Sequence, residues 1–182
     1  MPGAGYGQRM GGAGRRDAFT GTGRDSGTAG IGDQMAMRIP KGNTMTGEQQ
    51  KQRAKELFQA TDRADVEAVD AMISDDFTYE VMNRVPISLP TGEPFPSVYD
   101  KEAYLGFVRN IGNFTKDGMH LTYELAVSDG PYVALFGESH ATALSGKKYA
   151  NVYCWLFRFA DDKISLVREY CDTQLVRTVL FG

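Results

Sequence analysis

The chain has 182 residues and a mass of 20.0 kDa, enough for one domain with a substantial core. Hydrophobic residues make up 42% of it and charged residues 24%, as in ordinary globular proteins. No apolar run approaches the ~18 residues of a membrane span, so no membrane partner is expected. Residues 1–44 hold six Lys and Arg against three Asp, whereas the remainder holds fourteen against twenty. The net negative charge of residues 45–182 argues against nucleic acid as a partner.

The first 44 residues form a distinct segment. They are rich in glycine, contain one Phe and one Tyr, and show no hydrophobic period. Such a segment cannot bury enough apolar area to offset the entropy lost on ordering. We therefore predict a disordered tail over residues 1–44 and a single folded domain over residues 45–182.

The predicted elements begin with a helix at Thr46, whose hydroxyl can cap it while Gln49, three residues on, completes a capping box. Periodicity, capping residues and proline content predict the elements that follow. They are a short helix over residues 65–73, a strand over 75–83, an irregular loop with four prolines over 83–99, and a helix over 100–114.

Strands dominate the C-terminal part of the chain. Alternating apolar residues predict them over residues 119–128, 132–144, 147–160 and 163–171, and a last helical turn over 174–180. Because short turns join these strands, we expect antiparallel hairpins. Helices followed by such strands predict an α+β fold, in which a curved antiparallel sheet packs against N-terminal helices around one deep pocket.

This element order, with the run FRFADDKISLVREYCD near the C-terminus, is similar to the SnoaL-like branch of the superfamily of ketosteroid isomerase and nuclear transport factor. The resemblance covers about residues 46–182. It implies a cone-shaped barrel with one deep pocket, chemistry without a cofactor, and a homodimer that pairs through the outer face of the sheet. The outward residues Val152, Cys154 and Leu156 agree with such pairing, because they are too apolar to be left exposed. The alternative is that the terminal helix covers them.

Glu169 is the first candidate catalytic residue. In a strand it shares one face with Val167 and Cys171, whereas Arg168 lies on the other. The sequence REY resembles the Arg-acid-aromatic motif of limonene-epoxide hydrolases, whose acid points into the pocket. A carboxylate among apolar neighbours can give or take a proton near neutral pH. The alternative is a solvated edge position, with Glu169 paired to Arg168 or a lysine.

His140 is the second candidate, because Glu138, His140 and Thr142 share one face of their strand. Alignment of the GKKY turn with the epoxide hydrolases puts Glu138 and His140 where that family carries an Arg and an Asp of its catalytic triad. The resemblance therefore implies that Glu138 lines the pocket and that His140 and Glu169 form an acid–base pair, since His titrates where enzymes work. The alternative for a lone strand histidine is a hydrogen-bonded core residue.

The same alignment turns Asn151, Tyr153 and Trp155 into the pocket, where they suit contacts with a flat or prenylated ligand. On the first strand, Tyr79 matches the water-holding Tyr of the epoxide hydrolases. The resemblance implies that Tyr79 holds the reacting oxygen. The Asn that follows two residues later in that family is Val81 here.

Other chemistries lack their motifs. His120 and His140 are twenty positions apart without metal-ligand spacing, so no metal is expected, and His120 is expected at the pocket rim. The two cysteines, Cys154 and Cys171, cannot form a disulfide framework and predict free thiols in a reducing cytoplasm. The chain has no P-loop and no GxSxG motif.

Residues and resemblance together predict a cofactor-independent cyclase or isomerase of specialised metabolism. It would act by acid–base catalysis on a small apolar substrate of polyketide or terpenoid type. Opening of an epoxide by an internal hydroxyl, which gives a cyclic ether, is one such reaction. Two alternatives stay open: an epoxide hydrolase or dehydratase of the same fold, and a non-catalytic ligand-binding or assembly module.

Overall fold

The computed structural model describes residues 42–83, 88–89 and 91–182. All but the last three residues of the predicted tail lie outside the described residues. Thr44 is attached to the folded domain, because its backbone N and its Oγ1 donate to the carboxylate of Asp162 at 2.7 and 2.6 Å. No helix in the described part is long and apolar enough to cross a membrane.

Three helices lie over the sheet: α1 (Gly47–Asp62), α2 (Val66–Met72) and α3 (Lys101–Arg109). The predicted capping box of α1 is confirmed, since Thr46 Oγ1 accepts from Gln49 N while the Gln49 side chain accepts from Thr46 N. The carboxylates of Asp65 and Asp100 cap α2 and α3. The third helix ends earlier than predicted and continues as a 3-10 turn, Ile111–Asn113.

A six-stranded sheet carries the domain, in the order β2-β1-β8-β7-β4-β3. Its strands are β1 (Ile73–Val81), β2 (Val98–Asp100), β3 (Thr122–Asp129), β4 (Tyr132–Glu138), β7 (Val152–Ala160) and β8 (Lys163–Cys171). The α+β class is as predicted. However, β1 and β8 run parallel, so the sheet is mixed rather than antiparallel. Within the described residues β2 and β3 are its two edges, so it is open and not closed into the predicted barrel.

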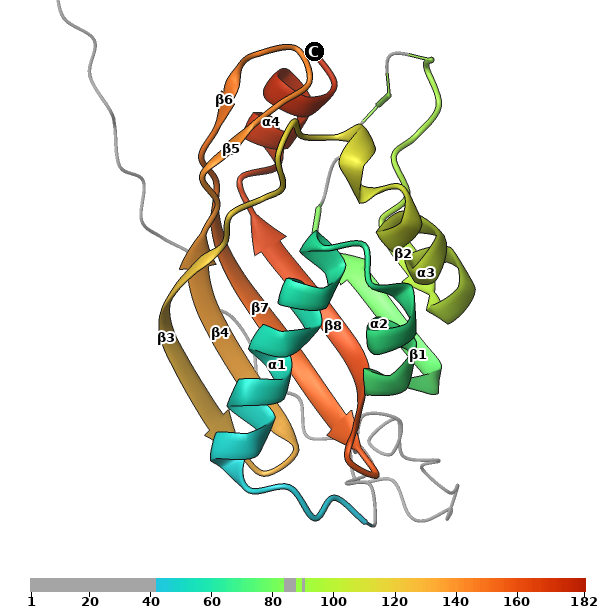
Figure 1. Cartoon of the computed structure of the whole chain (residues 1–182), viewed down its shortest axis with the longest axis vertical. Coiled ribbons are helices and arrows are strands. Elements are labelled where there is room, and N and C mark those ends of the chain that lie inside the picture. The colour runs from blue at the N-terminus through green and yellow to red at the C-terminus, as the bar shows by residue number, and fades with distance from the viewer. Residues whose placement is uncertain (1–41, 84–87, 90) are drawn as a thin grey trace, which may run out of the picture. The chain divides into compact units, whose positions relative to one another are not determined.

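Two of the predicted long strands are interrupted. The strand expected over residues 132–144 divides into β4 and β5 (Ala141–Thr142), and the next divides into β6 (Lys148–Tyr149) and β7. At the first break the backbone N of His140 bonds to the carbonyl of Met119 at 3.1 Å rather than to the neighbouring strand. β5 and β6 therefore pair only with each other, as a small hairpin near the C-terminal turn (Figure 1).

The core lies between the helices and one face of the sheet. α1 and α2 cross in front of the sheet and α3 lies beside β1 and β2 (Figure 1). Trp155, Phe157 and Phe159 alternate on the inner face of β7 and are almost completely buried. Phe58 of α1 packs against this row, with its ring centroid 4.7 Å from that of Trp155. The side chains on one face of β7 thus form one side of the hydrophobic core.

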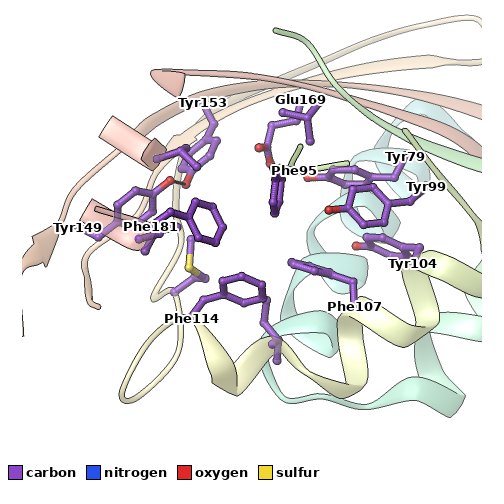
Figure 2. A pocket seen from close by; sticks show the side chains of 15 residues that line it. Tyr79, Phe95, Tyr99, Tyr104, Phe107, Phe114, Tyr149, Tyr153, Glu169 and Phe181 are labelled. Carbon is purple, nitrogen blue, oxygen red and sulfur yellow. Dashed lines mark hydrogen bonds between the residues drawn. The ribbon is translucent and has the colours of Figure 1, made fainter. Parts of the chain in front are cut away.

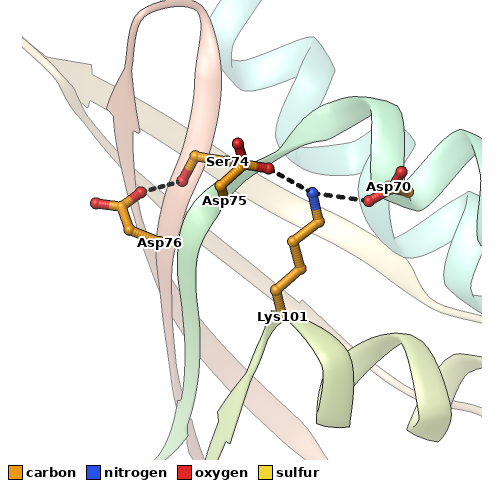
Figure 3. A network of polar contacts seen from close by, with 5 residues as sticks. All are labelled: Asp70, Ser74, Asp75, Asp76 and Lys101. Carbon is orange, nitrogen blue, oxygen red and sulfur yellow. Dashed lines mark hydrogen bonds and ion pairs between the residues drawn. The ribbon is translucent and has the colours of Figure 1, made fainter.

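Lys101 joins α3 to two other elements. Its Nζ lies 2.8 Å from Asp70 Oδ1 of α2 and 2.9 Å from Asp75 Oδ1 of β1 (Figure 3). The hydrogen bonds to Asp70 and Asp75 raise the pKa of Lys101, and the bond from Lys101 lowers the pKa of Asp75. The start of α3 is thereby positioned, and α3 in turn carries Tyr104 towards the interior.

The described chain closes with α4 (Thr173–Leu175) and a π-helical turn, Val176–Leu180, where a helical turn is predicted. Lys147, in the turn between β5 and β6, donates to the carbonyl of Thr178 at 3.1 Å and to that of Gly182 at 3.3 Å. These bonds hold the C-terminal turn against the small hairpin.

Candidate active site

An aromatic cavity lies between the inner face of the sheet, α3 and the C-terminal turn (Figure 2). Its empty space is about 670 Å³ when the open mouth is counted, and about 100 Å³ of it is accessible to the centre of a water molecule. Five tyrosines and four phenylalanines dominate its lining: Tyr79, Tyr99, Tyr104, Tyr149 and Tyr153, with Phe95, Phe107, Phe114 and Phe181. Such a wall suits a flat, largely apolar ligand.

Glu169 is the only carboxylate among the described residues that line this cavity. Its Oε2 accepts hydrogen bonds from Tyr79 Oη at 2.5 Å and from Trp155 Nε1 at 3.0 Å. Its Oε1 has one weak donor, the thiol of Cys171 at 3.6 Å. Because two strong donors hold Oε2, Oε1 has the lone pairs that a ligand can use.

Strand register brings these residues together. β8 lies between β1 and β7, and Glu169 pairs with Val81 on β1 and with Trp155 on β7. Tyr79 is two residues before Val81 and therefore on the same face. The polar cluster is thus made by neighbouring strands, which are more rigid than loops.

A second compartment, of about 450 Å³ with its open side included, adjoins the first and shares Glu169 and Tyr104 with it. Thr61 and Asp62, at the end of α1, also line it. Thr61 Oγ1 donates to the carbonyl of Leu57 at 2.9 Å, so the Tyr104 hydroxyl donates to Thr61 Oγ1 at 3.1 Å. The hydrogen of Tyr104 is therefore committed to the protein.

Burial raises the pKa of the cavity tyrosines. For Tyr79, Tyr104, Tyr149 and Tyr153 burial is the largest cause, and the charge of Glu169 raises the pKa further. Burial also raises the pKa of Tyr99 to about 12. All five phenols therefore stay protonated at neutral pH, and they act as hydrogen-bond donors rather than as bases.

Tyr149 and Tyr153 meet across the cavity from Tyr79 (Figure 2). Their hydroxyl oxygens are 2.9 Å apart, and both side chains are buried. The ring of Tyr153 stacks on Trp155, with centroids 4.5 Å apart and planes inclined by 10°. Trp155 therefore contacts both Tyr153 of this pair and the carboxylate.

Asn151 supports the pair from behind. Its Nδ2 donates to Tyr149 Oη at 2.9 Å and to the carbonyl of Asp172 at 3.1 Å. Its Oδ1 accepts from the backbone N of Val152 at 2.8 Å and of Asp172 at 3.0 Å. Every hydrogen-bonding position of the amide is used for structure, so its orientation is fixed.

The sequence from the second half of α1 to β8 shows which protein family the chain belongs to. The model of the SnoaL-like domain matches residues 54–167. The chain belongs to the SnoaL-like family. No curated protein matches it in sequence.

Solved structures share the fold of this SnoaL-like domain. An NTF2-like protein of unknown function from Burkholderia pseudomallei is 18% identical with a TM-score of 0.60, covering 76% of this chain and 100% of that one. IdmH of Streptomyces antibioticus, a proposed polyketide cyclase, is 19% identical with a TM-score of 0.55, covering 68% and 92%. An LEH-like epoxide hydrolase from M. tuberculosis is 18% identical with a TM-score of 0.51, covering 68% and 83%. At these identities the likeness shows the fold alone.

The SnoaL-like domain brings several predicted site residues together. Tyr79, Tyr153 and Glu169 line the cavity, and Trp155 lines the second compartment and holds Glu169. Asn151, predicted to touch the ligand, is 1% exposed and supports Tyr149 instead of lining the cavity. Within the described ranges, no group of three or more His, Cys, Asp or Glu is placed to hold a metal ion.

Glu138 and His140 lie elsewhere, on the outer face of the sheet. Their side chains are about half exposed, at 54% and 51%, and His140 Nε2 is 3.2 Å from Glu138 Oε1. His140 does not line the cavity, so the structure does not bring it to Glu169. The predicted rim residue His120 is also exposed and lies 3.4 Å from Asp117.

The register between β4 and β7 explains this difference. Leu135 pairs with Trp155, and Gly137 pairs with Tyr153. Since paired residues share a face, the inward side of β4 carries the odd-numbered residues. Ser139, which is completely buried, takes the next inward position, and His140 therefore points outward.

Much of the aromatic wall was missed by the sequence interpretation. Phe95, Phe114 and Phe181 come from a loop, a turn and the C-terminal end, where no period marks an inward side. Tyr149 belongs to the two-residue strand β6, too short to show alternation. The one sequence feature that could have indicated these residues is composition. Phe and Tyr are concentrated in these irregular segments, where polar residues are more usual.

Proposed function

We propose that this SnoaL-like domain is a cofactor-independent enzyme that moves a proton on a small, largely apolar, aromatic substrate, as in isomerisation or aldol-type ring closure. One observation carries the proposal. A single carboxylate among the described lining residues, Glu169, lies in an aromatic cavity with Oε2 held by Tyr79 and Trp155, while Oε1 has only the weak thiol contact of Cys171. A general base needs such an available lone pair at a fixed position.

In the proposed reaction, Glu169 Oε1 removes a proton from a carbon next to a carbonyl. The electron pair moves into an enolate, which either regains the proton at another carbon or attacks an internal carbonyl and then regains it. The bonds from Tyr79 and Trp155 hold the carboxylate in one orientation. The aromatic walls exclude water, which favours internal attack over hydrolysis.

The lining and the structural neighbours support a polyketide-like substrate. TerC, whose structure was determined with polyporic acid, has a TM-score of 0.59 at 14% identity, covering 72% of this chain and 97% of that one. IdmH is a proposed polyketide cyclase. Epoxide hydrolysis has less support, because Glu138 and His140 lie on the outer face rather than beside Glu169.

Ligand binding without catalysis is the second candidate function. The two donors hold Oε2 and leave Oε1, which would accept a hydrogen bond from a ligand hydroxyl without taking its proton.

Glu169→Gln tests both candidates, because it keeps the shape and removes the base. We expect kcat to fall about 10²–10⁴-fold on a substrate found among hydroxyquinones and phenolic polyketones, with ligand affinity changed much less. His140→Ala is the matched control and should keep near-wild-type turnover, since its imidazole is outside the cavity. Full turnover in Glu169→Gln would contradict the enzyme proposal. Tight binding by the wild type without turnover of any bound compound would favour the binding module.

We further propose a homodimer formed through the outer face of the sheet. Leu125, Phe136, Cys154 and Tyr170 pair in register across β3, β4, β7 and β8, and Val152 beside them is 64% exposed. Such a row favours a partner surface. Sedimentation at micromolar concentration should give a dimer that Val152→Asp converts to a monomer; a wild-type monomer would refute the proposal.

A cytoplasmic location is proposed from the free thiols, Cys154 and Cys171.

A further inference from the structure

The phenol pair of Tyr149 and Tyr153 has more hydrogens than the surrounding protein uses. Tyr149 Oη accepts from Asn151 Nδ2, and Ser139 Oγ accepts from the backbone N of Asn151 at 3.1 Å. Tyr153 Oη is 2.9 Å from Tyr149 Oη; burial raises the pKa of Tyr153, and a hydrogen bond from the Ser139 side chain acts against that rise. The hydroxyls of Ser139, Tyr149 and Tyr153 carry three hydrogens. The contacts Ser139–Tyr153 and Tyr149–Tyr153 use two of them, so among the described residues one hydrogen has no acceptor.

Burial decides where that hydrogen goes. Ser139 is completely buried and does not line the cavity, so a spare hydrogen on it would lie in the interior without an acceptor, which is unfavourable. Tyr149 and Tyr153 both line the cavity. The spare hydrogen therefore belongs to one of these phenols and points into the ligand space.

We propose that the Tyr149–Tyr153 pair is a second binding site in the cavity, which donates one hydrogen bond to an acceptor oxygen of the ligand. The chemical class is an aromatic ketone or quinone, whose carbonyl oxygen becomes an enolate oxygen after proton removal. This inference rests on the proposed function in one respect: the ligand occupies the same cavity as Glu169.

Trp155 fixes the distance between the two polar sites. Its indole stacks on Tyr153 and its Nε1 donates to Glu169 Oε2. A carbonyl held by the phenol pair is therefore held relative to the carboxylate as well. A donor aimed at the oxygen where charge develops is the arrangement that stabilises an enolate.

Equilibrium binding of two neutral probes tests the site without any turnover. The probes are 1-tetralone and tetralin, which differ mainly in the carbonyl. We expect the wild-type protein to prefer the ketone about 3- to 10-fold, the gain of one neutral hydrogen bond. Tyr149→Phe or Tyr153→Phe alone leaves one spare hydrogen at the site and should keep a preference. The double variant should lose it, while its affinity for tetralin stays the same.

The carbonyl stretch of ¹³C-labelled 1-tetralone gives a second measurement. It should lie at lower frequency in the wild-type complex than in the complex of the double variant, because a donor weakens the C=O bond. Tyr104→Phe is the matched control: its hydroxyl is in the same cavity but donates to Thr61, so the ketone preference should persist.

Three results would overturn the site: equal affinity of the wild type for both probes, an unchanged ketone preference in the double variant, or loss of the preference in Tyr99→Phe instead. The outcome is separable from that of the proposed function. Glu169→Gln should lower kcat about 10²–10⁴-fold yet retain the ketone preference. The double variant should lose the preference whether or not a substrate is known.

Discussion

At the scale of single residues, the two oxygens of Glu169 differ in what holds them. Tyr79 and Trp155 donate to Oε2, whereas Oε1 receives only the weak thiol contact of Cys171. Burial and the charge of Glu169 raise the pKa of Cys171 well above its ordinary value of 9.0. The thiol therefore stays protonated, so it acts on Oε1 only as a weak donor and does not compete with Glu169 as a base in the proposed reaction.

Tyr79→Phe is expected to lower kcat about 10-fold or more, since the hydrogen bond that holds Oε2 of Glu169 in place is lost. Tyr104→Phe, which removes a phenol bonded to Thr61 rather than to Glu169, should keep kcat near the wild-type value. Equal kcat in Tyr79→Phe and the wild type would show that the bond from Tyr79 does not orient the base.

Period-two alternation separates the two faces of a strand but does not say which face is the inner one. On β7 the resemblance to the epoxide hydrolases, rather than the pattern, turned Tyr153 and Trp155 inward, because Val152 and Leu156 on the opposite face are apolar as well. The pattern is equally undecided on β4, where Leu135 on one face and Phe136 on the other are both apolar. Only the pairing of β4 with β7 determines which face is inner, and cross-strand register has no local signal in the sequence.

At the scale of elements, α3 depends on its cap. Asp100 Oδ1 accepts from the backbone N of Ala103 at 2.9 Å. Asp100→Ala should lower the free energy of unfolding by about 1 kcal/mol, measured by urea denaturation. Asp100→Ser retains a capping oxygen and should remain close to wild type. If the Ala and Ser variants were equally stable, the cap would not be what stabilises α3.

Helix starts were predictable because capping is local: Thr46, Asp65 and Asp100 lie within three residues of their partners. The breaks between β4 and β5 and between β6 and β7 were not. At those breaks the side chain of Ser139 accepts from the backbone of Asn151, and Asn151 in turn bonds backbone groups. Such side-chain bonds replace ladder bonds without changing the apolar pattern.

At the scale of the whole molecule, Asp162 ties the start of the described chain to the turn between β7 and β8. The hydrogen bonds from Thr44, and then from Met45, lower the pKa of Asp162 below its ordinary value of 3.8. A depressed folded-state pKa contributes stability above the unfolded value, and this is lost as pH falls through the folded value.

Asp162→Asn should therefore have a slightly lower Tm than wild type at pH 6, by less than about 3 °C. The difference should shrink as the pH falls below 3.8, because the wild-type carboxylate then becomes protonated. Thermal unfolding followed by circular dichroism at pH 6 and pH 2.5 measures both values. A Tm difference independent of pH would mean that the charge of Asp162 does not contribute.

The parallel pairing of β1 with β8 also has a consequence for biosynthesis. Tyr79 and Glu169 are separated by 90 positions, and β1 has no central partner until β8 exists. While the ribosome is still making the intervening helix and hairpins, β1 can pair only with the three-residue β2. Folding of this sheet is therefore a late event, and the nascent chain must keep an apolar strand from aggregating until then. A ligand of the cavity can therefore stabilise the folded domain only after β8, which carries Glu169, has left the exit tunnel of the ribosome.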